Sequence, residues 1–163
     1  MAVLVTGGAG YIGSHTCVEL LASGKDIVVI DNLSNSKEQS LSRVKHITGK
    51  NFPFYPYDLC IEEDLKKVFK QHEIQSAIHF AGFKAVGESV DFPLRYYDNN
   101  LRSTLNLLKV MDSFGIKNFV FSSSATVYGN PHTVPITEDF PLAATNPYGS
   151  TKLVIEQILK DLF

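Results

Sequence analysis

The chain has 163 residues, of which 44% are hydrophobic and 20% are charged, and its formal net charge is −2. At roughly 150 residues per domain, this length predicts one domain with a single sizeable core, and the apolar fraction excludes a disordered chain. The charge balance gives no reason to expect a nucleic acid or an anionic membrane as a partner. Because no apolar run reaches the roughly 18 residues of a membrane span, we expect a soluble, cytoplasmic protein.

Short apolar segments alternate with longer helical patterns, which is typical of βαβ units. The pattern predicts an α/β fold with a doubly wound parallel sheet, and several of its strands have the consecutive apolar residues of strands buried on both faces. The five expected strands are Ala2–Val5, Ile27–Ile30, Phe52–Tyr55, Ala77–Phe80 and Asn118–Phe121.

Segments with helical spacing separate the first four strands. Tyr11–Ser23 is the first expected helix. Ser36 and Gln39 have the spacing of a capping box, which predicts a short helix ending at Gly49. Ile61–His72 begins with acidic residues that complement the helix dipole, so this charge run indicates a helix start rather than a binding patch.

The last third of the chain is expected to contain two helices and an irregular loop. Four residues at helical spacing predict a helix face directed toward the core or a partner: Leu101, Leu105, Leu108 and Met111. Residues 130–147 contain four prolines and no regular period, which predicts a loop of the kind that carries binding residues. Thr151–Phe163 has an amphipathic helical pattern with no stop signal.

A glycine-rich turn follows the first strand directly. Gly7, Gly10 and Gly13 stand between that strand and a helix, which is the context required of a dinucleotide-binding Rossmann turn. Glycine allows the tight turn and the close approach of a pyrophosphate, and the helix N-terminus offers N–H donors to the phosphates. The alternative is an ordinary glycine-rich turn between a strand and a helix.

Asp31 ends the second strand, eighteen residues after Gly13 and close to the spacing of a ribose-binding acid. A carboxylate there accepts from the adenosine ribose hydroxyls and repels a 2′-phosphate, so the expected cofactor is NAD rather than NADP. The sequence has no Lys in a P-loop arrangement, which argues against an ATP or GTP site.

Tyr148 and Lys152 are four residues apart, a spacing that places both side chains on one face of a helix. A tyrosine is a poor base at neutral pH, and a nearby ammonium group favours its phenolate form. The pair therefore suits the removal of a proton from a sugar or alcohol hydroxyl while hydride leaves the same carbon. In isolation, such a pair is more often a surface feature of a helix than a site.

Three serines follow the fifth strand, and Ser124 is the one we expect to contact a substrate oxygen and the tyrosine. Ligands of parallel α/β sheets bind at the carboxyl ends of the strands. The alternative is a polar strand end that leads into a loop.

Together these motifs resemble the extended short-chain dehydrogenase/reductase superfamily, and within it the sequence is similar to the UDP-glucose 4-epimerase (UDP-galactose 4-epimerase) family. The similarity runs from Val3 to Phe163. It is carried by segments 5–15, 31–36, 79–82, 84–89, 96–100, 122–129 and 147–149. Segments 84–89 and 122–129 are more specific to epimerases than the others.

The resemblance implies roles for individual residues. Tyr11 and Ile12 would lie on the pyrophosphate, Lys152 would hold the nicotinamide ribose, and Thr126 would lie near the sugar. The other implied cofactor contacts are Asn32, Asn35 and Ser36 near the adenosine ribose, Asp58 and Leu59 beside the adenine, and Phe80, Ala81, Gly82, Lys84 and Asn99 along the cofactor cleft.

The resemblance also separates epimerases from related dehydratases. Nucleotide-sugar 4,6-dehydratases carry an Asp-Glu pair where this chain has Ala125 and Thr126. Without a carboxyl group there, elimination lacks its acid and base. The implied reaction is oxidation at sugar C4, turnover of the 4-keto sugar in the pocket and reduction from its other face, which interconverts UDP-galactose and UDP-glucose in galactose metabolism.

Two alternatives remain open: an epimerase or reductase of another UDP-sugar, and an NAD-binding module without turnover. The family also continues through further strands and a C-terminal domain that grips the uridine nucleotide. We therefore expect residues 1–163 to be an N-terminal portion, an incomplete NAD-binding domain that stops after the fifth strand and its helix. Family members form homodimers through the region 93–114 and the final helix.

The two cysteines, Cys17 and Cys60, and the five histidines lack ligand spacing, so we expect reduced thiols and no metal.

Overall fold

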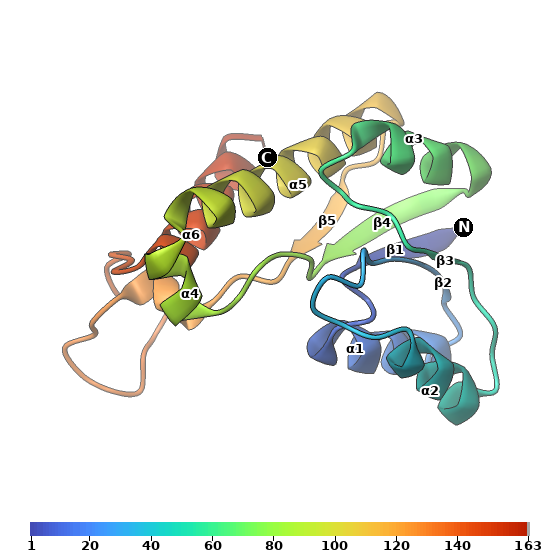
Figure 1. Cartoon of the computed structure of the whole chain (residues 1–163), viewed down its shortest axis with the longest axis horizontal. Helices are drawn as coiled ribbons and strands as arrows, with labels where there is room; N and C mark the ends of the chain where they lie inside the picture. Colours follow the sequence, from blue (N-terminus) through green and yellow to red (C-terminus); the bar gives the residue numbers. More distant parts are fainter. Residues whose placement is uncertain (163) are drawn as a thin grey trace. The chain divides into compact units, whose positions relative to one another are not determined.

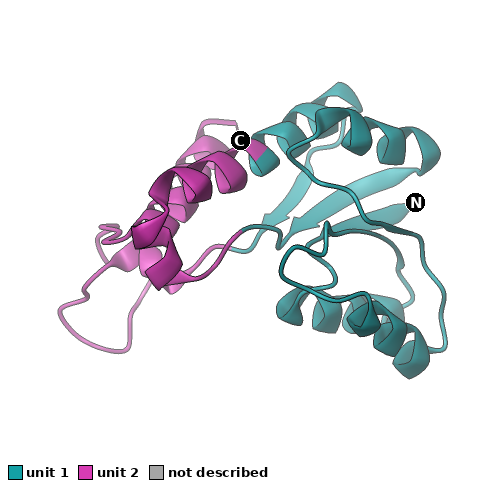
Figure 2. Cartoon of the chain, viewed as in Figure 1, with its two compact units in different colours: residues 1–82, 103–122 teal, residues 83–102, 123–163 magenta. Residues whose placement is uncertain are grey.

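The computed structural model describes residues 1–162 and divides into two compact units (Figure 2). The first unit contains residues 1–82 and 103–122, and the second contains residues 83–102 and 123–163. The boundary therefore crosses the long helix α5 (Pro93–Ser113). Phe163, the last residue of the expected final helix, lies outside the described residues.

The first unit is built on a parallel sheet with the strand order β3-β2-β1-β4-β5 (Figure 1). Its strands are β1 (Ala2–Thr6), β2 (Asp26–Ile30), β3 (Phe54–Tyr55), β4 (Ile74–His79) and β5 (Asn118–Phe121). The order reverses between β1 and β4, where doubly wound sheets bind their ligands. The expected fold class is confirmed.

Helices cover both faces of this sheet because neighbouring strand residues point to opposite sides. Val3 and Val5 pack with residues of α1 (Tyr11–Ala22) and α2 (Gln39–Thr48). Leu4 instead packs with residues of α3 (Glu62–Gln71) and of the C-terminal part of α5. The central strands are thus buried on both faces, as their consecutive apolar residues predict.

Two strands differ from their expected bounds by more than one residue at an end, whereas β1 and β2 are each one residue longer than expected. β3 is two residues long rather than four, because Pro53 and Pro56 flank it and proline cannot donate to a sheet ladder. β4 begins at Ile74, three residues before the expected start. The polar residues Gln75 and Ser76 hide this half of the strand from an apolar pattern, although Ile74 and Ser76 pair with β1.

The expected capping box is wrong. Helix α2 begins at Gln39, and its N-cap residue Glu38 makes no side-chain capping bond. The Ser36 hydroxyl donates instead to Asp31 Oδ1 at 2.8 Å. The helix itself exists and ends before Gly49, as expected.

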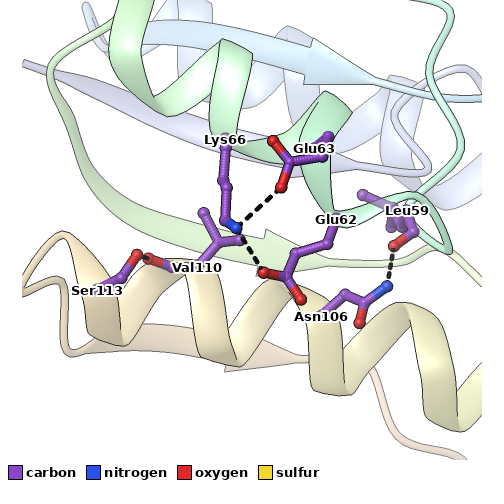
Figure 3. A network of polar contacts seen from close by, with 7 residues as sticks. All are labelled: Leu59, Glu62, Glu63, Lys66, Asn106, Val110 and Ser113. Carbon is purple, nitrogen blue, oxygen red and sulfur yellow. Dashed lines mark hydrogen bonds and ion pairs between the residues drawn. The ribbon is translucent and has the colours of Figure 1, made fainter.

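The acidic first turn of α3 confirms the helix-start interpretation (Figure 3). Lys66 Nζ lies 2.8 Å from Glu62 Oε1 and 3.0 Å from Glu63 Oε1, so the charge run pairs within its own helix. The amide of Asn106 on α5 donates to the Leu59 carbonyl oxygen at 3.0 Å. This bond ties the loop before α3 to α5 within the first unit.

The expected core stripe on α5 is only partly correct. Met111 is buried, but Leu105 is 37% exposed. The other buried apolar residues of the helix are Tyr96, Leu107 and Val110. Leu107 and Val110 lie one residue before Leu108 and Met111 of the expected series. A leucine repeat alone does not distinguish the buried stripe from its neighbouring stripe, since both recur at helical spacing.

The second unit contains the helices α4 (Val86–Asp91) and α6 (Pro147–Leu162), the first part of α5, and the 3₁₀ turn η1 (Ala125–Tyr128). Helix α6 begins at Pro147, four residues before the expected segment, because proline is favoured at the first helical position. Residues 130–146 form neither helix nor strand, which confirms the expected loop.

Among residues 1–162, no helix is long and apolar enough to cross a membrane. In the same described part of the chain, no three His, Cys, Asp or Glu side chains converge as they would around a metal ion. Cys17 is buried in the core, where burial raises the pKa of its thiol to about 12.

Candidate active site

The glycine turn of the first unit is packed so closely that side chains are excluded. A Cβ added to Gly7, whose φ is +69°, would lie 2.6 Å from the Ala81 nitrogen. A Cβ on Gly13 would lie 2.3 Å from the Gly7 carbonyl oxygen. The turn therefore packs closely against the start of α1 and the end of β4, as a glycine-rich dinucleotide-binding turn requires.

The first turn of α1 is open to solvent. The exposed fractions of the Tyr11 and Ile12 side chains are 81% and 47%. Gly10 is the N-cap residue and makes no side-chain capping bond. This surface is free to receive a ligand of the first unit.

Asp31 lies at the carboxyl end of β2 and organises the loop after it. Its Oδ2 accepts from the Ala9 N–H at 3.0 Å, and its Oδ1 accepts from the Leu33 N–H at 2.9 Å. Leu33 has a φ of 57°, a conformation that bulky residues rarely adopt. These bonds hold the carboxylate beside the glycine turn, with lone pairs left for a ribose hydroxyl.

The structure brings several other expected adenosine contacts close to Asp31. Asn32 Nδ2 donates to Asp58 Oδ2 at 3.2 Å, and Ser36 bonds Asp31 directly. Asn35 is exposed in the same loop. Leu59 differs from the others, because its side chain is 5% exposed and packs within the core cluster.

The end of β4 lies against the glycine turn. Phe80 is 8% exposed and packs in the core, whereas Ala81 is half-buried. His79, immediately before them, is buried and its Nδ1 lies 2.6 Å from the Thr6 hydroxyl oxygen. Gly82 follows with a φ of 142°. The sequence analysis gave His79 no role, although a histidine at the end of a buried strand indicates that its ring makes a hydrogen bond.

Tyr148 and Lys152 lie together at the start of α6 in the second unit. The Lys152 Nζ atom is 5.9 Å from the centre of the Tyr148 ring. Lys152 is 3% exposed and Tyr148 is 8% exposed. Burial lowers the pKa of Lys152 to about 8, with a smaller contribution from the charge of Lys84. An amine and a phenol at the start of one helix are thus buried together.

Ser124 and Thr126 form a second polar pair in this unit. Ser124 is the N-cap residue of η1, and its Oγ accepts from the Thr126 N–H at 3.2 Å and from the Thr126 hydroxyl at 2.9 Å. Ser123 instead donates to Glu156 Oε1 on α6. Of these two serines, Ser124 is thus held next to Thr126, and Ser123 anchors the chain to α6.

Lys84 is exposed and Asn99 is half-buried, both within the second unit. The Asn99 amide donates to Asn100 Oδ1 at 2.9 Å. Asn100, Ser89 and Thr151 are buried polar residues that sequence reasoning did not single out. Asparagine is unfavourable inside helices, so a residue such as Asn100 in the middle of α5 indicates a specific side-chain hydrogen bond.

Comparison with known proteins places the chain in a family. The family model described as GDP-mannose 4,6 dehydratase matches residues 4–162. The chain belongs to this family. One relative, UDP-glucose 4-epimerase of Bacillus subtilis, is 66% identical over 162 residues, which are 99% of this chain and 48% of that protein. The chain spans about half the length of the curated relatives it matches.

Two solved structures are similar to the chain over nearly its whole length. UDP-glucose 4-epimerase from Bifidobacterium longum, in complex with NAD+ and UDP, has a TM-score of 0.97 at 54% identity. It is matched over 99% of this chain and 49% of its own. UDP-glucose-4-epimerase from Stenotrophomonas maltophila, with bound NAD and formylated UDP-arabinopyranose, has a TM-score of 0.96 at 46% identity, with 99% and 48% of the two chains covered.

The two residues after Ser124 carry no carboxyl group. Ala125 and Thr126 stand where the sequence resemblance expects the acid pair of a dehydratase, and they form the first residues of η1. The Thr126 hydroxyl is bonded to Ser124. Neither residue can act as an acid or base in an elimination.

Proposed function

We propose that the whole protein containing this chain is an NAD-dependent UDP-glucose 4-epimerase, which interconverts UDP-galactose and UDP-glucose in galactose metabolism. The observation that carries this proposal is the buried pair of Tyr148 and Lys152 at the start of α6, in a family member without a dehydratase acid pair. The high identity to proteins named UDP-glucose 4-epimerase supports it.

In this proposal the second unit supplies the proton chemistry. Tyr148 takes the proton of the sugar 4-hydroxyl as general base, and it returns that proton when the 4-keto sugar is reduced from its other face. Lys152 places its amine beside the tyrosine ring and holds the nicotinamide ribose. Ser124 donates to the reacting sugar oxygen, with Thr126 beside the sugar.

The first unit would hold the adenosine and diphosphate half of the cofactor. NAD held there would supply the hydride-transfer chemistry at sugar C4. The turn of Gly7, Gly10 and Gly13 leaves room for the diphosphate, and Asp31 accepts from the ribose hydroxyls and repels the 2′-phosphate of NADP. The remaining proposed contacts from the first unit are Tyr11, Ile12, Asn32, Asn35, Ser36, Asp58, Leu59, Phe80, Ala81 and Gly82. Lys84 and Asn99 are proposed as contacts from the second unit. Leu59 would contribute through its backbone, since its side chain packs in the core.

We test the proposal in the whole protein, expressed from its complete gene, with the substitution Tyr148→Phe. The variant loses the base but keeps the ring, so we expect turnover of UDP-galactose to fall by at least about 10²-fold while NAD stays bound. Coupled assay of UDP-glucose formation and absorbance of the bound cofactor measure the two effects. A Tyr148→Phe protein with ordinary turnover would disprove the assignment.

Measuring NADH distinguishes an epimerase from a net dehydrogenase or reductase. An epimerase regenerates its cofactor in each turnover, so the NAD pool stays constant while UDP-glucose accumulates. Stoichiometric accumulation of NADH with product would contradict the proposal.

A second candidate is the epimerisation of another UDP-sugar. It is favoured by the 46% identical structure with bound formylated UDP-arabinopyranose. The ratio of kcat/KM for UDP-galactose, UDP-N-acetylgalactosamine and UDP-arabinose in the whole protein decides between the two candidates. A ratio that favours UDP-galactose over both others supports the first.

We further propose that the uridine end of the substrate is bound by residues outside this chain, and that the whole protein is a cytoplasmic homodimer. The span of about half of the relatives' length supports the first point. The exposed leucines Leu94 and Leu105 of α5, at 81% and 37%, support a partner on this helix. A third candidate, an NAD-binding module without turnover, predicts that residues 1–163 alone bind NAD but leave UDP-galactose unchanged.

A further inference from the structure

The side chain of Asn100 is buried at the centre of a hydrogen-bond network in the second unit. Its Oδ1 accepts from the Phe83 N–H at 2.8 Å and from the Asn99 amide at 2.9 Å. Its Nδ2 donates to the Phe83 carbonyl at 3.1 Å and to the Thr151 hydroxyl at 3.1 Å. Asn100 is 2% exposed, and these four bonds use all of its ordinary donor and acceptor capacity.

One side of this network fixes the backbone around Lys84. Asn100 holds both polar groups of Phe83, the residue before Lys84. The Ala85 N–H, on the residue after Lys84, donates to the Tyr96 hydroxyl oxygen at 3.1 Å. Tyr96 is fully buried and itself donates to Glu88 Oε2 at 2.6 Å. Side chains of α5 therefore hold the peptide groups on both sides of Lys84.

The other side of the network fixes the backbone of Tyr148. The Thr151 hydroxyl donates to the Tyr148 carbonyl oxygen at 2.7 Å. The Tyr148 N–H donates to Ser89 Oγ at 3.2 Å, and Ser89 donates to the Val86 carbonyl oxygen at 2.6 Å. Ser89 and Thr151 are both fully buried. Both peptide groups of the tyrosine are thus bonded by buried hydroxyls.

We propose that Asn100, acting through the Thr151 hydroxyl, is a positioning residue that holds the start of α6 against the Lys84 segment. It touches none of the reacting groups itself. Tyr148 and Lys152 lie within the first six residues of α6, so a small displacement of this helix start moves both side chains together. This inference rests on the proposed function for its catalytic consequence, although the network can be tested without it.

Thr151 offers a matched pair of substitutions. Thr151→Val keeps the shape of the side chain and removes the hydroxyl, whereas Thr151→Ser keeps the hydroxyl. In the whole protein we expect Thr151→Val to lower kcat by at least about tenfold and to change KM for UDP-galactose by less than about threefold, because misplaced groups cost rate more than affinity. Thr151→Ser should restore most of kcat.

Three outcomes would overturn the inference. The first is an unchanged kcat in Thr151→Val, and the second is a loss of kcat that matches the loss of folded protein. The third is a Thr151→Ser variant as slow as Thr151→Val. If Thr151 contributes only to stability, the second outcome is expected, because each folded molecule then turns over substrate at the wild-type rate.

Amide hydrogen exchange tests the network independently of activity. In Asn100→Ala we expect the Phe83 N–H to exchange at least about tenfold faster, while the Leu4 N–H in the core of β1 keeps its rate. If Asn100→Ala does not fold, the Tyr148 N–H in Thr151→Val is measured against Thr151→Ser, with faster exchange expected in the former. Unchanged exchange at these amides would overturn the inference. If the wild-type protein has no epimerase activity, the proposed function is refuted. The hydrogen-exchange measurement still tests the network in that case.

Discussion

Lys152 is a cation that the fold keeps out of water. Its side chain is 3% exposed, and burial lowers its pKa to about 8 from an ordinary value of 10.5. A folded-state pKa below the unfolded one means that the unfolded chain binds the proton more tightly. The charged form of Lys152 therefore destabilises the fold below about pH 8, and this cost disappears as the pH rises toward 10.5.

We predict that Lys152→Met makes the protein more stable and inactive. At pH 7 the free energy of unfolding should rise by up to about 3 kcal/mol, the equivalent of the pKa difference. The gain over wild type should shrink between about pH 8 and 10.5, as the wild-type lysine loses its proton. Urea unfolding of the whole protein at pH 7 and pH 10 measures both values.

Lys160→Met is the control for this prediction, because Lys160 lies exposed in the last turn of the same helix. It should show no comparable gain. Equal stabilisation by the two substitutions would mean that removal of any charge from α6, rather than of a buried one, has the effect.

The start of α1 shows how one element depends on close backbone packing. Gly13 sits in the first turn of the helix, and its hydrogen atoms are the only groups that fit against the Gly7 carbonyl. A helix normally gains from alanine in place of glycine, by up to about 1 kcal/mol. At Gly13 the overlap with the backbone outweighs that gain.

We predict that Gly13→Ala destabilises the protein by about 2 kcal/mol and weakens NAD binding, because the turn must open to admit the methyl group. Gly87→Ala is the matched control. Gly87 also lies in a helix, α4, but an added Cβ meets nothing within 4 Å. Thermal unfolding with and without NAD measures both properties, and similar losses in the two variants would contradict the packing argument.

In the whole molecule, β5 is an edge strand of the sheet, because it lies at one end of the strand order. Val120 within β5 is 59% exposed. An apolar strand at the edge of a sheet can pair with the edge of another molecule. Natural proteins prevent such pairing with charged residues or a covering element.

We predict that a polypeptide of residues 1–163 aggregates through this edge and that Val120→Lys slows the aggregation. Val154→Lys, a change of the same charge at a 41% exposed valine of α6, should have little effect. Light scattering at 37 °C and equal concentration compares the three proteins. Equal slowing by both lysines would indicate a general effect of charge rather than of the strand edge.

Local patterns predicted the elements whose cause is itself local. The turn at Gly7, the acidic start of α3 and the spacing of Tyr148 and Lys152 follow from backbone conformation, helix dipole and helical periodicity. Even there, flanking residues shifted the bounds, since Pro147 starts α6 earlier and polar residues hide the first half of β4. The capping box failed because the Ser36 hydroxyl donates to the Asp31 carboxylate and α2 begins only at Gln39.

Local sequence patterns account for the alternation of strands and helices, the glycine turn followed by Asp31, and the spacing of Tyr148 and Lys152 on one helix. Which polar residues are buried, and which groups they form hydrogen bonds with, depends on the tertiary structure. Asn100 meets Thr151 across fifty-one residues of sequence, and Leu59 lies in the core rather than on an open surface. Burial and long-range hydrogen bonds depend on how distant segments pack, and no short pattern encodes that packing. The low pKa of Lys152 arises in the same way, because the water around it is displaced by residues far away in the chain.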